Sequence, residues 1–452
     1  MNLKKFLITL VTGSLIFPQM SGASVHMSLS QYVREILVNN PSLQSGIKSV
    51  EADYYSVLAS VGSQRLQVGA SSGFTWISKV QGKDNYTAGN IGITLTKRID
   101  ISNSFTLDQQ QNILGYEISR AQFDNALNDL IATAEETWWG AVLARENVKL
   151  QREILLQRSE NHRVTVEKFN QELVPRLDVV RSEAQVVEAE ATAKTAETTY
   201  QNLLANLSFL AGGLDVEPEE EELRVPEFDI ELNQEDALNF RPDVRAAKLT
   251  LERAKIAKKL NAKGLSPTLD FAFTGYPWSD PKTSTTPNGQ QVMGNLSLNF
   301  PLFNGRQTKY KVLNSDRLIQ SAEANLKYLQ ETTKRDIIVA LNNWKEAASS
   351  EHDKKRQVER SEEELRITEL MYAEGMGAQI DLINAQTAYQ SVRTEYLDAV
   401  KNMYVALVDL RKAIGDYSPD ENGDWDEAVA RYAKGNDIQN ETGVKNLRTD
   451  TK

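Results

Sequence analysis

The sequence predicts a mainly helical α+β chain in which one structural unit is written twice. Three observations support this fold class. A short helix, two strands, a long helix and a shorter returning helix follow one another twice along the 452 residues. The strands alternate between apolar and polar residues, and each long helical stretch lacks proline. Helices of that length indicate an elongated body rather than a compact domain.

The N-terminus has the pattern of a secretory signal peptide over residues 1–23. Lys4 and Lys5 precede an apolar run at residues 6–17, and small residues lead up to Ala23. Charged start, apolar centre and small-residue end predict cleavage after Ala23. An N-terminal membrane anchor is the alternative, but the run has only about half the length that spans a bilayer. The rest of the chain is therefore expected to be exported.

The composition excludes several classes of protein. The chain has no cysteine, so neither a disulfide framework nor a lipidated N-terminal cysteine is possible. Its net charge of −11 disfavours a nucleic-acid partner, because binding to phosphates depends on basic surface. Beyond the leader, no apolar run is long enough to predict a transmembrane helix.

The repeat divides the chain into a first unit at residues 24–214 and a second at 230–416. An acidic linker with two prolines joins them at 215–229, and a polar tail follows at 417–452. Each unit is expected to begin with a short helix that carries an early proline, Pro41 or Pro242.

The predicted strands have two chemically different faces. Leu269, Phe271 and Phe273 alternate with polar or small residues, and two further segments, at 90–95 and 295–300, repeat this pattern. A half-buried sheet would alternate in the same way. Export and a length of about ten residues favour strands that cross a bilayer at a tilt. Trp76 and Trp278 near the strand ends suit either an interfacial aromatic girdle or ordinary packing.

A long helix follows each strand pair, at about 107–172 and 307–373, and a shorter helix returns after a turn. The returning helices carry apolar residues at alternating spacings of three and four, which predicts a coiled-coil seam. In the first unit the seam is Val179, Ser182, Val186, Ala189, Ala193, Ala196, Tyr200, Leu203, Leu207 and Leu210. In the second it is Leu382, Ala385, Tyr389, Val392, Tyr396, Ala399, Met403, Ala406, Leu410 and Ala413.

Four lipid-facing strands cannot remain an open sheet in a membrane, because their edges would carry unpaired backbone groups. Closure therefore requires more than one chain. Three chains would give twelve strands, an even number within the range of outer-membrane barrels. The residue patterns by themselves do not choose three copies over two or four.

The chain resembles TolC-type outer-membrane factors. The resemblance covers about Ser28 to Asp416 and depends on an ordered set of motifs rather than on any single one. The motifs are Pro41, Pro242, the Phe300–Gly305 run, and the turn patterns Phe169-Asn170…Leu173…Asp178 and Tyr372…Gly375…Asp381-Leu382.

The resemblance implies a homotrimer with four strands per chain. A 12-stranded β-barrel in the outer membrane would continue into a long periplasmic α-helical coiled-coil barrel. The expected function is the exit duct of a tripartite efflux pump or type I secretion system. Its expected partners are a periplasmic adaptor protein, an inner-membrane pump or ABC transporter, and outer-membrane lipid.

By the same resemblance, the helix turns form a periplasmic gate. The expected gate residues are Asp178, Tyr372, Asp381 and Asn384. Asn384 departs from the family, which can have a second acidic residue there. Both aspartates also fit a role as helix N-terminal residues that the helix dipole stabilises. The expected adaptor-docking residues, apolar or small at exposed turns, are Leu173, Val174, Gly375 and Met376.

No catalytic, cofactor-binding or metal site is expected. His26 borders the leader, and His162 and His352 are expected on solvated helix faces, without cysteine or other local partners. Two alternatives remain besides a duct. A structural coiled-coil protein of the cell envelope would leave the matched strands without a role, and a stand-alone porin would leave the long helices without one.

Overall fold

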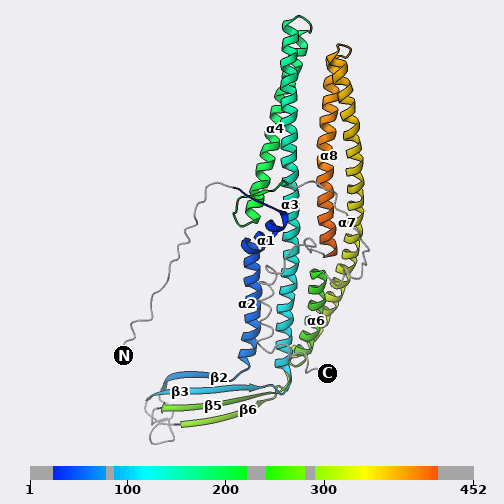
Figure 1. The fold of residues 1–452 in the computed structure, drawn as a ribbon. Helices are drawn as coiled ribbons and strands as arrows, with labels where there is room; N and C mark the ends of the chain where they lie inside the picture. Colours follow the sequence, from blue (N-terminus) through cyan, green and yellow to red (C-terminus); the bar gives the residue numbers. More distant parts are fainter. Residues whose placement is uncertain (1–23, 78–85, 221–240, 280–290, 416–452) are drawn as a thin grey trace, which may run out of the picture.

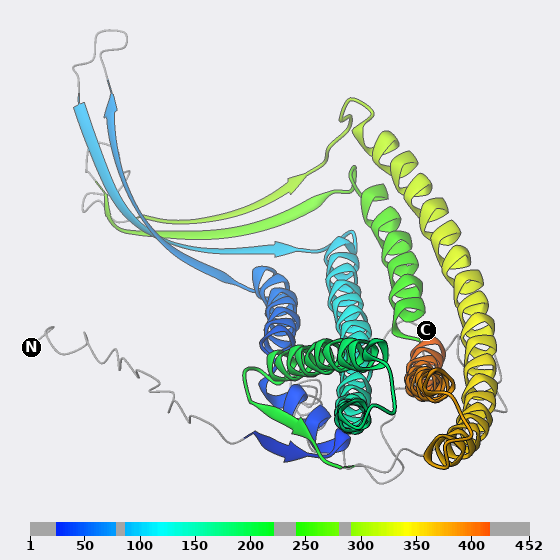
Figure 2. The same ribbon diagram turned by 90° about the horizontal axis from the view of Figure 1, so that it is seen from above.

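The computed structural model describes residues 24–77, 86–220, 241–279 and 291–415. They form a long helical body with a four-stranded sheet at one end (Figure 1). Seen from above, the strands extend away from the body and curve together, while the helices form a bent wall (Figure 2). The prediction of a mainly helical, duplicated chain is confirmed.

Two helices of 67 residues run the length of the body, α3 (Ser104–Asn170) and α7 (Gln307–Ala373). With a rise of 1.5 Å per residue, each is about 100 Å long. Both were predicted within a few residues of their observed ends, because nothing in either stretch interrupts a helix.

Two shorter helices lie end to end beside each long helix (Figure 1). α2 (Pro41–Ser63) and α4 (Arg176–Leu210) cover α3, whereas α6 (Pro242–Ala262) and α8 (Gln379–Ile414) cover α7. α3 also contacts α6 and α8, so α3 joins the two halves. The body is therefore a slab with α7 at one edge and the α2–α4 line at the other.

The first short helix is broken in two, so the expectation of one proline-bearing helix was wrong. α1 (Leu29–Asn39) ends at Asn40, whose backbone is extended (φ −66°, ψ 119°), and Pro41 then begins α2. A residue before proline avoids helical geometry, and proline fits the first turn because it has no N–H to satisfy. In the second half α6 begins at Pro242, and the part of the expected helix before residue 241 lies outside the described ranges.

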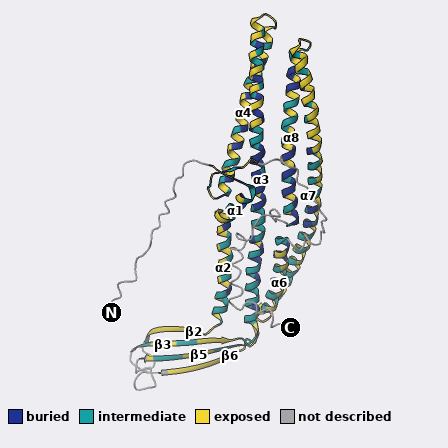
Figure 3. Ribbon diagram, in the orientation of Figure 1, coloured by how far each residue is buried: buried dark blue, intermediate teal, exposed yellow. Residues whose placement is uncertain are grey.

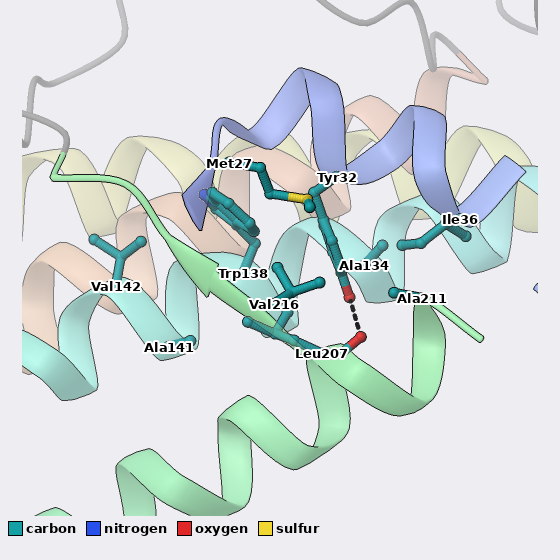
Figure 4. Packing of buried hydrophobic residues seen from close by; sticks show 10 residues of the cluster. All are labelled: Met27, Tyr32, Ile36, Ala134, Trp138, Ala141, Val142, Leu207, Ala211 and Val216. Carbon is teal, nitrogen blue, oxygen red and sulfur yellow. Dashed lines mark hydrogen bonds between the residues drawn. The ribbon is translucent and has the colours of Figure 1, made fainter. Parts of the chain in front are cut away.

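One buried cluster ties α1 to α3 and α4 (Figure 4). The Tyr32 ring stacks on Trp138 with 5.1 Å between ring centroids, and its hydroxyl donates to the carbonyl of Leu207 at 3.2 Å. Burial raises the pKa of the Tyr32 hydroxyl, which therefore remains a donor. The Asn40 amide donates to the Leu210 carbonyl at 2.9 Å, which fixes the α1–α2 break against the end of α4.

The two predicted seams are confirmed. Burial is concentrated along α3 and α8 (Figure 3), and every buried residue of α4 belongs to its predicted seam. α8 has, in addition, a second buried stripe that the seam did not predict. In this stripe Val400 and Tyr404 cluster with Leu143 of α3. The second stripe joins the two halves.

The sheet is antiparallel in the order β2-β3-β5-β6. Its strands are β2 (Gln67–Ile77), β3 (Tyr86–Ile99), β5 (Thr268–Ser279) and β6 (Gln291–Asn299). Each half contributes one antiparallel pair, and β3 and β5 join the pairs. β2 and β6 are left as the open edges.

One face of this sheet is apolar and exposed. The strand register places its large side chains on the same side as Leu95 and Leu269, while the opposite face carries polar pairs such as Arg98–Asp270 at 2.7 Å. An exposed apolar sheet face of this kind suits lipid rather than water. Its exposed members include Val68, Ile93, Phe271, Phe273, Leu296 and Leu298.

A second, two-stranded sheet was not predicted. β1 (Val25–Met27) pairs in parallel with β4 (Val216–Pro218), so the segment expected to be a linker at 215–229 begins as a strand. The part of the linker beyond residue 220 lies outside the described residues, as do the leader and the tail from 416. Within the described ranges, no helix combines the length and apolar character needed to cross a bilayer.

Candidate gate and docking turns

The two helix turns lie together at the end of the body opposite the sheet (Figure 1). In the first, Glu172 adopts a left-handed backbone (φ 61°) and the N–H of Leu173 donates to the Lys168 carbonyl at 2.9 Å, closing α3. The Leu173 side chain is exposed, whereas Val174 is half-buried. Pro175 has an extended backbone and directly precedes α4.

The second turn repeats this geometry with a glycine in the left-handed position. Gly375 has φ 72°, and the N–H groups of Met376 and Gly377 both donate to the Met371 carbonyl, at 2.9 and 3.1 Å. Met376 is exposed, and the space around Gly375 is open. Three of the expected docking residues, Leu173, Gly375 and Met376, therefore lie at the tips, and Val174 lies just behind them.

The two expected gate aspartates occupy equivalent places. Asp178 is the third residue of α4, and Asp381 is the third residue of α8. Asp178 is half-buried and lies 4.0 Å from Arg181, while Asp381 is exposed, with the exposed Asn384 one turn farther along α8. Both aspartates lie in the first turn at the positive end of a helix dipole, so their positions fit the expected stabilisation by the dipole.

Tyr372 connects the tips of the two halves. Its ring lies under the ammonium group of Lys168, 4.0 Å from the nitrogen to the ring centroid. The ring also packs beside the buried Leu365 and Leu382. The Tyr372 hydroxyl is buried and has no hydrogen-bond partner among the described residues, which leaves a donor available at the expected gate.

Sequence reasoning missed a polar contact between α3 and α8 below the turns. Arg158 is buried, and its guanidinium donates to Gln386 at 3.3 Å and to Thr387 and Gln390 at 3.0 Å each. Burial lowers the pKa of Arg158, and Glu188 opposes that shift. All three acceptors are neutral oxygens, so a buried positive charge is held by α8 without a hydrogen-bonded carboxylate.

This polar contact continues toward the turns. The Asn161 amide donates to Gln386 at 3.3 Å, and the Gln379 amide donates to the Thr165 hydroxyl at 3.1 Å. We call Arg158, Asn161 and Thr165 with their α8 partners the polar seam. Nearer the sheet the same helix pair is apolar.

The apolar part of the α3–α8 contact centres on two stacked rings. Trp139 and Tyr404 lie 3.8 Å apart between centroids, with 12° between their planes. Leu143, Val400 and Met403 surround them. Apolar contacts lose their stabilisation on exposure to water, whereas neutral polar groups can exchange partners with it. The helix pair is therefore held most firmly at its middle and least firmly toward the turns.

One histidine expectation was wrong. His162 is half-buried, and its Nδ1 lies 2.8 Å from the hydroxyl of the seam residue Ser182, so it is not a solvated side chain. His352 is exposed as expected. Among the described residues, no group of three or more histidines or carboxylates is arranged to hold a metal ion.

A family model described as "Outer membrane efflux protein" matches residues 32–213 and 234–416. Nodulation protein T of Rhizobium leguminosarum bv. trifolii is 24% identical over 422 residues, which cover 86% of this chain and 86% of that protein. Nodulation protein T of Rhizobium leguminosarum bv. viciae is 22% identical over 397 residues, which cover 86% of this chain and 82% of that protein.

Solved structures have the same fold. The Campylobacter jejuni CmeC outer membrane channel superposes with a TM-score of 0.79 and 16% identity, covering 93% of this chain and 94% of that one. The open state of the Neisseria gonorrhoeae MtrE outer membrane channel superposes with a TM-score of 0.76 and 20% identity, covering 86% of this chain and 88% of that one.

Proposed function

The chain belongs to the outer membrane efflux protein family, and on this premise we propose that it is the passive exit duct of a tripartite efflux pump or type I secretion system. One observation carries the proposal. The exposed apolar sheet face and the paired helix turns lie at opposite ends of helices about 100 Å long. That length joins a membrane-embedded end to a docking end across an aqueous compartment.

A homotrimer closes the sheet. The open edges at β2 and β6 carry unpaired backbone groups, which a bilayer does not tolerate. Three copies of the four-stranded sheet form twelve strands, within the range of outer-membrane barrels, and the apolar face then contacts lipid.

The helical slab also has two edges with exposed apolar side chains, which the neighbouring copies cover. Burial of such side chains drives association, and a closed ring of slabs makes a tunnel. On α7 they include Tyr310, Leu313, Leu318 and Tyr328; on the opposite edge they include Tyr55, Val180 and Val187.

The turns form the gate. In the closed state the Lys168–Tyr372 contact and the polar seam hold the α7–α8 hairpin against α3. The hairpins part at the turns, and the Trp139–Tyr404 stack holds them together at the middle of the body. Asp178 and Asp381 face the opening as carboxylates, with Asn384 as a neutral neighbour.

The exposed tips at Leu173, Gly375 and Met376, with Val174 behind them, dock a periplasmic adaptor. The adaptor connects the duct to an inner-membrane pump or ABC transporter, which supplies the energy and selects the cargo. Residues 1–23 are the signal peptide that exports the chain, and the absence of cysteine means that the duct is not lipidated.

Fractionation and single-channel recording test this function together. The chain should be recovered from the outer membrane as a heat-modifiable trimer, with a helix-rich circular dichroism spectrum, and should conduct in planar bilayers. Deleting the gene should also abolish export through its pump. A soluble periplasmic monomer, or a trimer whose loss leaves export unchanged, would contradict the proposal.

A further inference from the structure

The first described residues form a strap with the start of the linker. The N–H of Val25 donates to the Asp215 carbonyl at 2.9 Å, and the N–H of Glu219 donates to the Met27 carbonyl at 3.1 Å. Met27 and Val216 are buried beneath these bonds in the cluster of Figure 4. The strap, β1 with β4, therefore holds residues just after the leader against the junction of the two halves.

Glu217, in the middle of β4, collects contacts from three elements. Its carboxylate accepts hydrogen bonds from the Tyr200 hydroxyl of α4 and from the Ser24 hydroxyl, each at 2.9 Å. Besides Tyr200, the charged or titratable groups facing it are His26 on β1 and Arg145 on α3. Burial raises the pKa of Glu217, but the hydrogen bonds and positive charges outweigh burial and lower it, so the group is a carboxylate at neutral pH.

Arg145 does not neutralise this carboxylate by direct pairing. Its guanidinium donates to the backbone carbonyls of Pro218 and Glu219, at 2.6 and 3.0 Å. Glu217 therefore has two hydroxyl donors and no cation at hydrogen-bond distance among the described residues. A cation at Ser24 would give the Glu217 carboxylate a directly paired positive charge.

We propose that removal of the leader creates an ion pair between the new α-ammonium of Ser24 and the carboxylate of Glu217, and that this pair closes the strap. The step is hydrolysis of the Ala23–Ser24 amide. Water adds across the bond, Ala23 leaves as a carboxylate, and Ser24 retains its nitrogen, which is an ammonium at neutral pH. The inference rests on the signal peptide of the proposed function.

Covalent geometry brings the new charge within reach. The Ser24 hydroxyl oxygen lies 2.9 Å from a Glu217 carboxylate oxygen. The Ser24 nitrogen is three bonds from that hydroxyl oxygen, so it lies no farther than about 6.6 Å from the carboxylate. Opposite charges at this separation stabilise each other, and the freed end can rotate to shorten it. Before cleavage the same nitrogen is a neutral amide.

Cleavage also releases the body from the inner membrane. Six residues lie between Phe17, the end of the apolar run, and Ser24, and the seven steps along the chain span at most about 25 Å. The strap lies at the sheet-ward end of α4, whose 35 residues place it about 50 Å from the turns. A retained leader would tether the strap too close to the inner membrane for the turns to face that membrane. One hydrolysis therefore frees the body and fastens its new end.

An insertion variant isolates the ammonium. Ser-Gly placed between Ala23 and Ser24 keeps the cleavage residue and the Ser24 hydroxyl but moves the charge two residues away. Glu217→Gln removes the acceptor charge instead. Glu220→Gln is the matched control, because Glu220 is an exposed linker carboxylate that pairs with Lys149 at 3.1 Å. Intact mass of each purified trimer gives its first residue.

Hydrogen exchange measured by mass spectrometry then reports the strap in peptides covering 24–28 and 215–220. At pH 6.5, exchange in these peptides should be about fivefold faster in the insertion variant and in Glu217→Gln than in wild type, because both variants lose an ion pair at a partly exposed site. The pair raises the folded pKa of the α-amino group, so its contribution is present at low pH and is lost as pH rises through that value. At pH 9.5 the ratio of the insertion variant to wild type should approach one, whereas Glu217→Gln should keep the part of its effect that comes from Tyr200 and Arg145. Glu220→Gln should match wild type throughout.

Two results would overturn the inference. One is a wild-type mass that does not begin at Ser24. The other is exchange in the insertion variant equal to wild type at pH 6.5. Both measurements use purified trimer and need no transport partner, so an export defect in an otherwise normal trimer would count against the proposed function and not against the strap.

Discussion

Replacing Arg158 with alanine should favour the open state of the duct. Arg158 donates three hydrogen bonds from α3 to α8 and is 6% exposed. When α8 moves away from α3, these bonds are exchanged for bonds to water. In the proposed gate the closed state therefore depends on them, and we expect the apolar Trp139–Tyr404 contact to persist in both states.

The magnitude follows from two opposing contributions. A hydrogen bond from a charged donor contributes about 1.5–3 kcal/mol, but the buried guanidinium has no carboxylate partner and its desolvation offsets much of that gain. A net loss of about 2 kcal/mol from the closed state is expected. It would raise the open-to-closed ratio about 30-fold, since 1.4 kcal/mol corresponds to a factor of ten.

Planar-bilayer recording and sensitivity of cells to a large antibiotic that the closed duct excludes would both detect this change. Arg163→Ala is the matched control, because Arg163 lies on the same helix but is exposed and pairs with Glu160 and Glu167 of its own helix. If the Arg158 and Arg163 variants both form trimers and both conduct as wild type does, the polar seam does not hold the closed state.

Four further outcomes are expected. Asp381→Ala should change single-channel conductance and its pH dependence, and an unchanged record would remove Asp381 from the gate. Gly375→Lys should abolish export while the trimer survives. Met376→Lys adds the same charge at a position whose backbone is not left-handed, so it causes no backbone strain. It should also abolish export if the tip docks an adaptor. Glu172→Gly should raise the free energy of unfolding by up to about 1 kcal/mol, measured by thermal denaturation, because glycine tolerates φ 61°. Burial alone would raise the pKa of Asp100, but hydrogen bonds from three backbone N–H groups outweigh this effect and lower the pKa below its ordinary value. The carboxylate therefore stabilises the fold above the unfolded-state pKa, and this stabilisation is lost as the pH falls through the folded-state pKa. Asp100→Asn should flatten the acid side of the curve of stability against pH.

The long helices and their seams could be predicted because their signals are local and repeated. A heptad seam is visible at every third or fourth residue, and strand alternation at every second. The break at Asn40 was missed because a proline near a helix start fits either an early turn or a new helix. β1 and β4 were missed because three-residue strands are too short to show a period, and their pairing joins residues 25 and 216.

The polar seam could not be predicted for a different reason. Arg158 lies in a helix rich in charged residues, where one more arginine resembles a solvated side chain. Its burial depends on α8, more than 200 residues away in sequence. The surroundings of His162 were mispredicted for a similar reason, although its partner Ser182 stands out as the one small polar residue in its seam. A polar residue in a seam is a signal that a polar partner lies opposite.

The duplication explains where the duct can move. The two long helices have equal lengths, yet α3 has 20 buried residues and α7 has six. α3 lies between both halves, whereas α7 lies at an edge that only a neighbouring copy can cover. The two units meet at α3, which contacts both α6 and α8, and at β3 with β5. Among the described residues, the α3–α8 contact has no comparable counterpart between α7 and α4. Because the α3–α8 contact is apolar at its middle and polar toward the turns, we expect the proposed gate to open by separation of these helices at the turn end, with the sheet end unchanged.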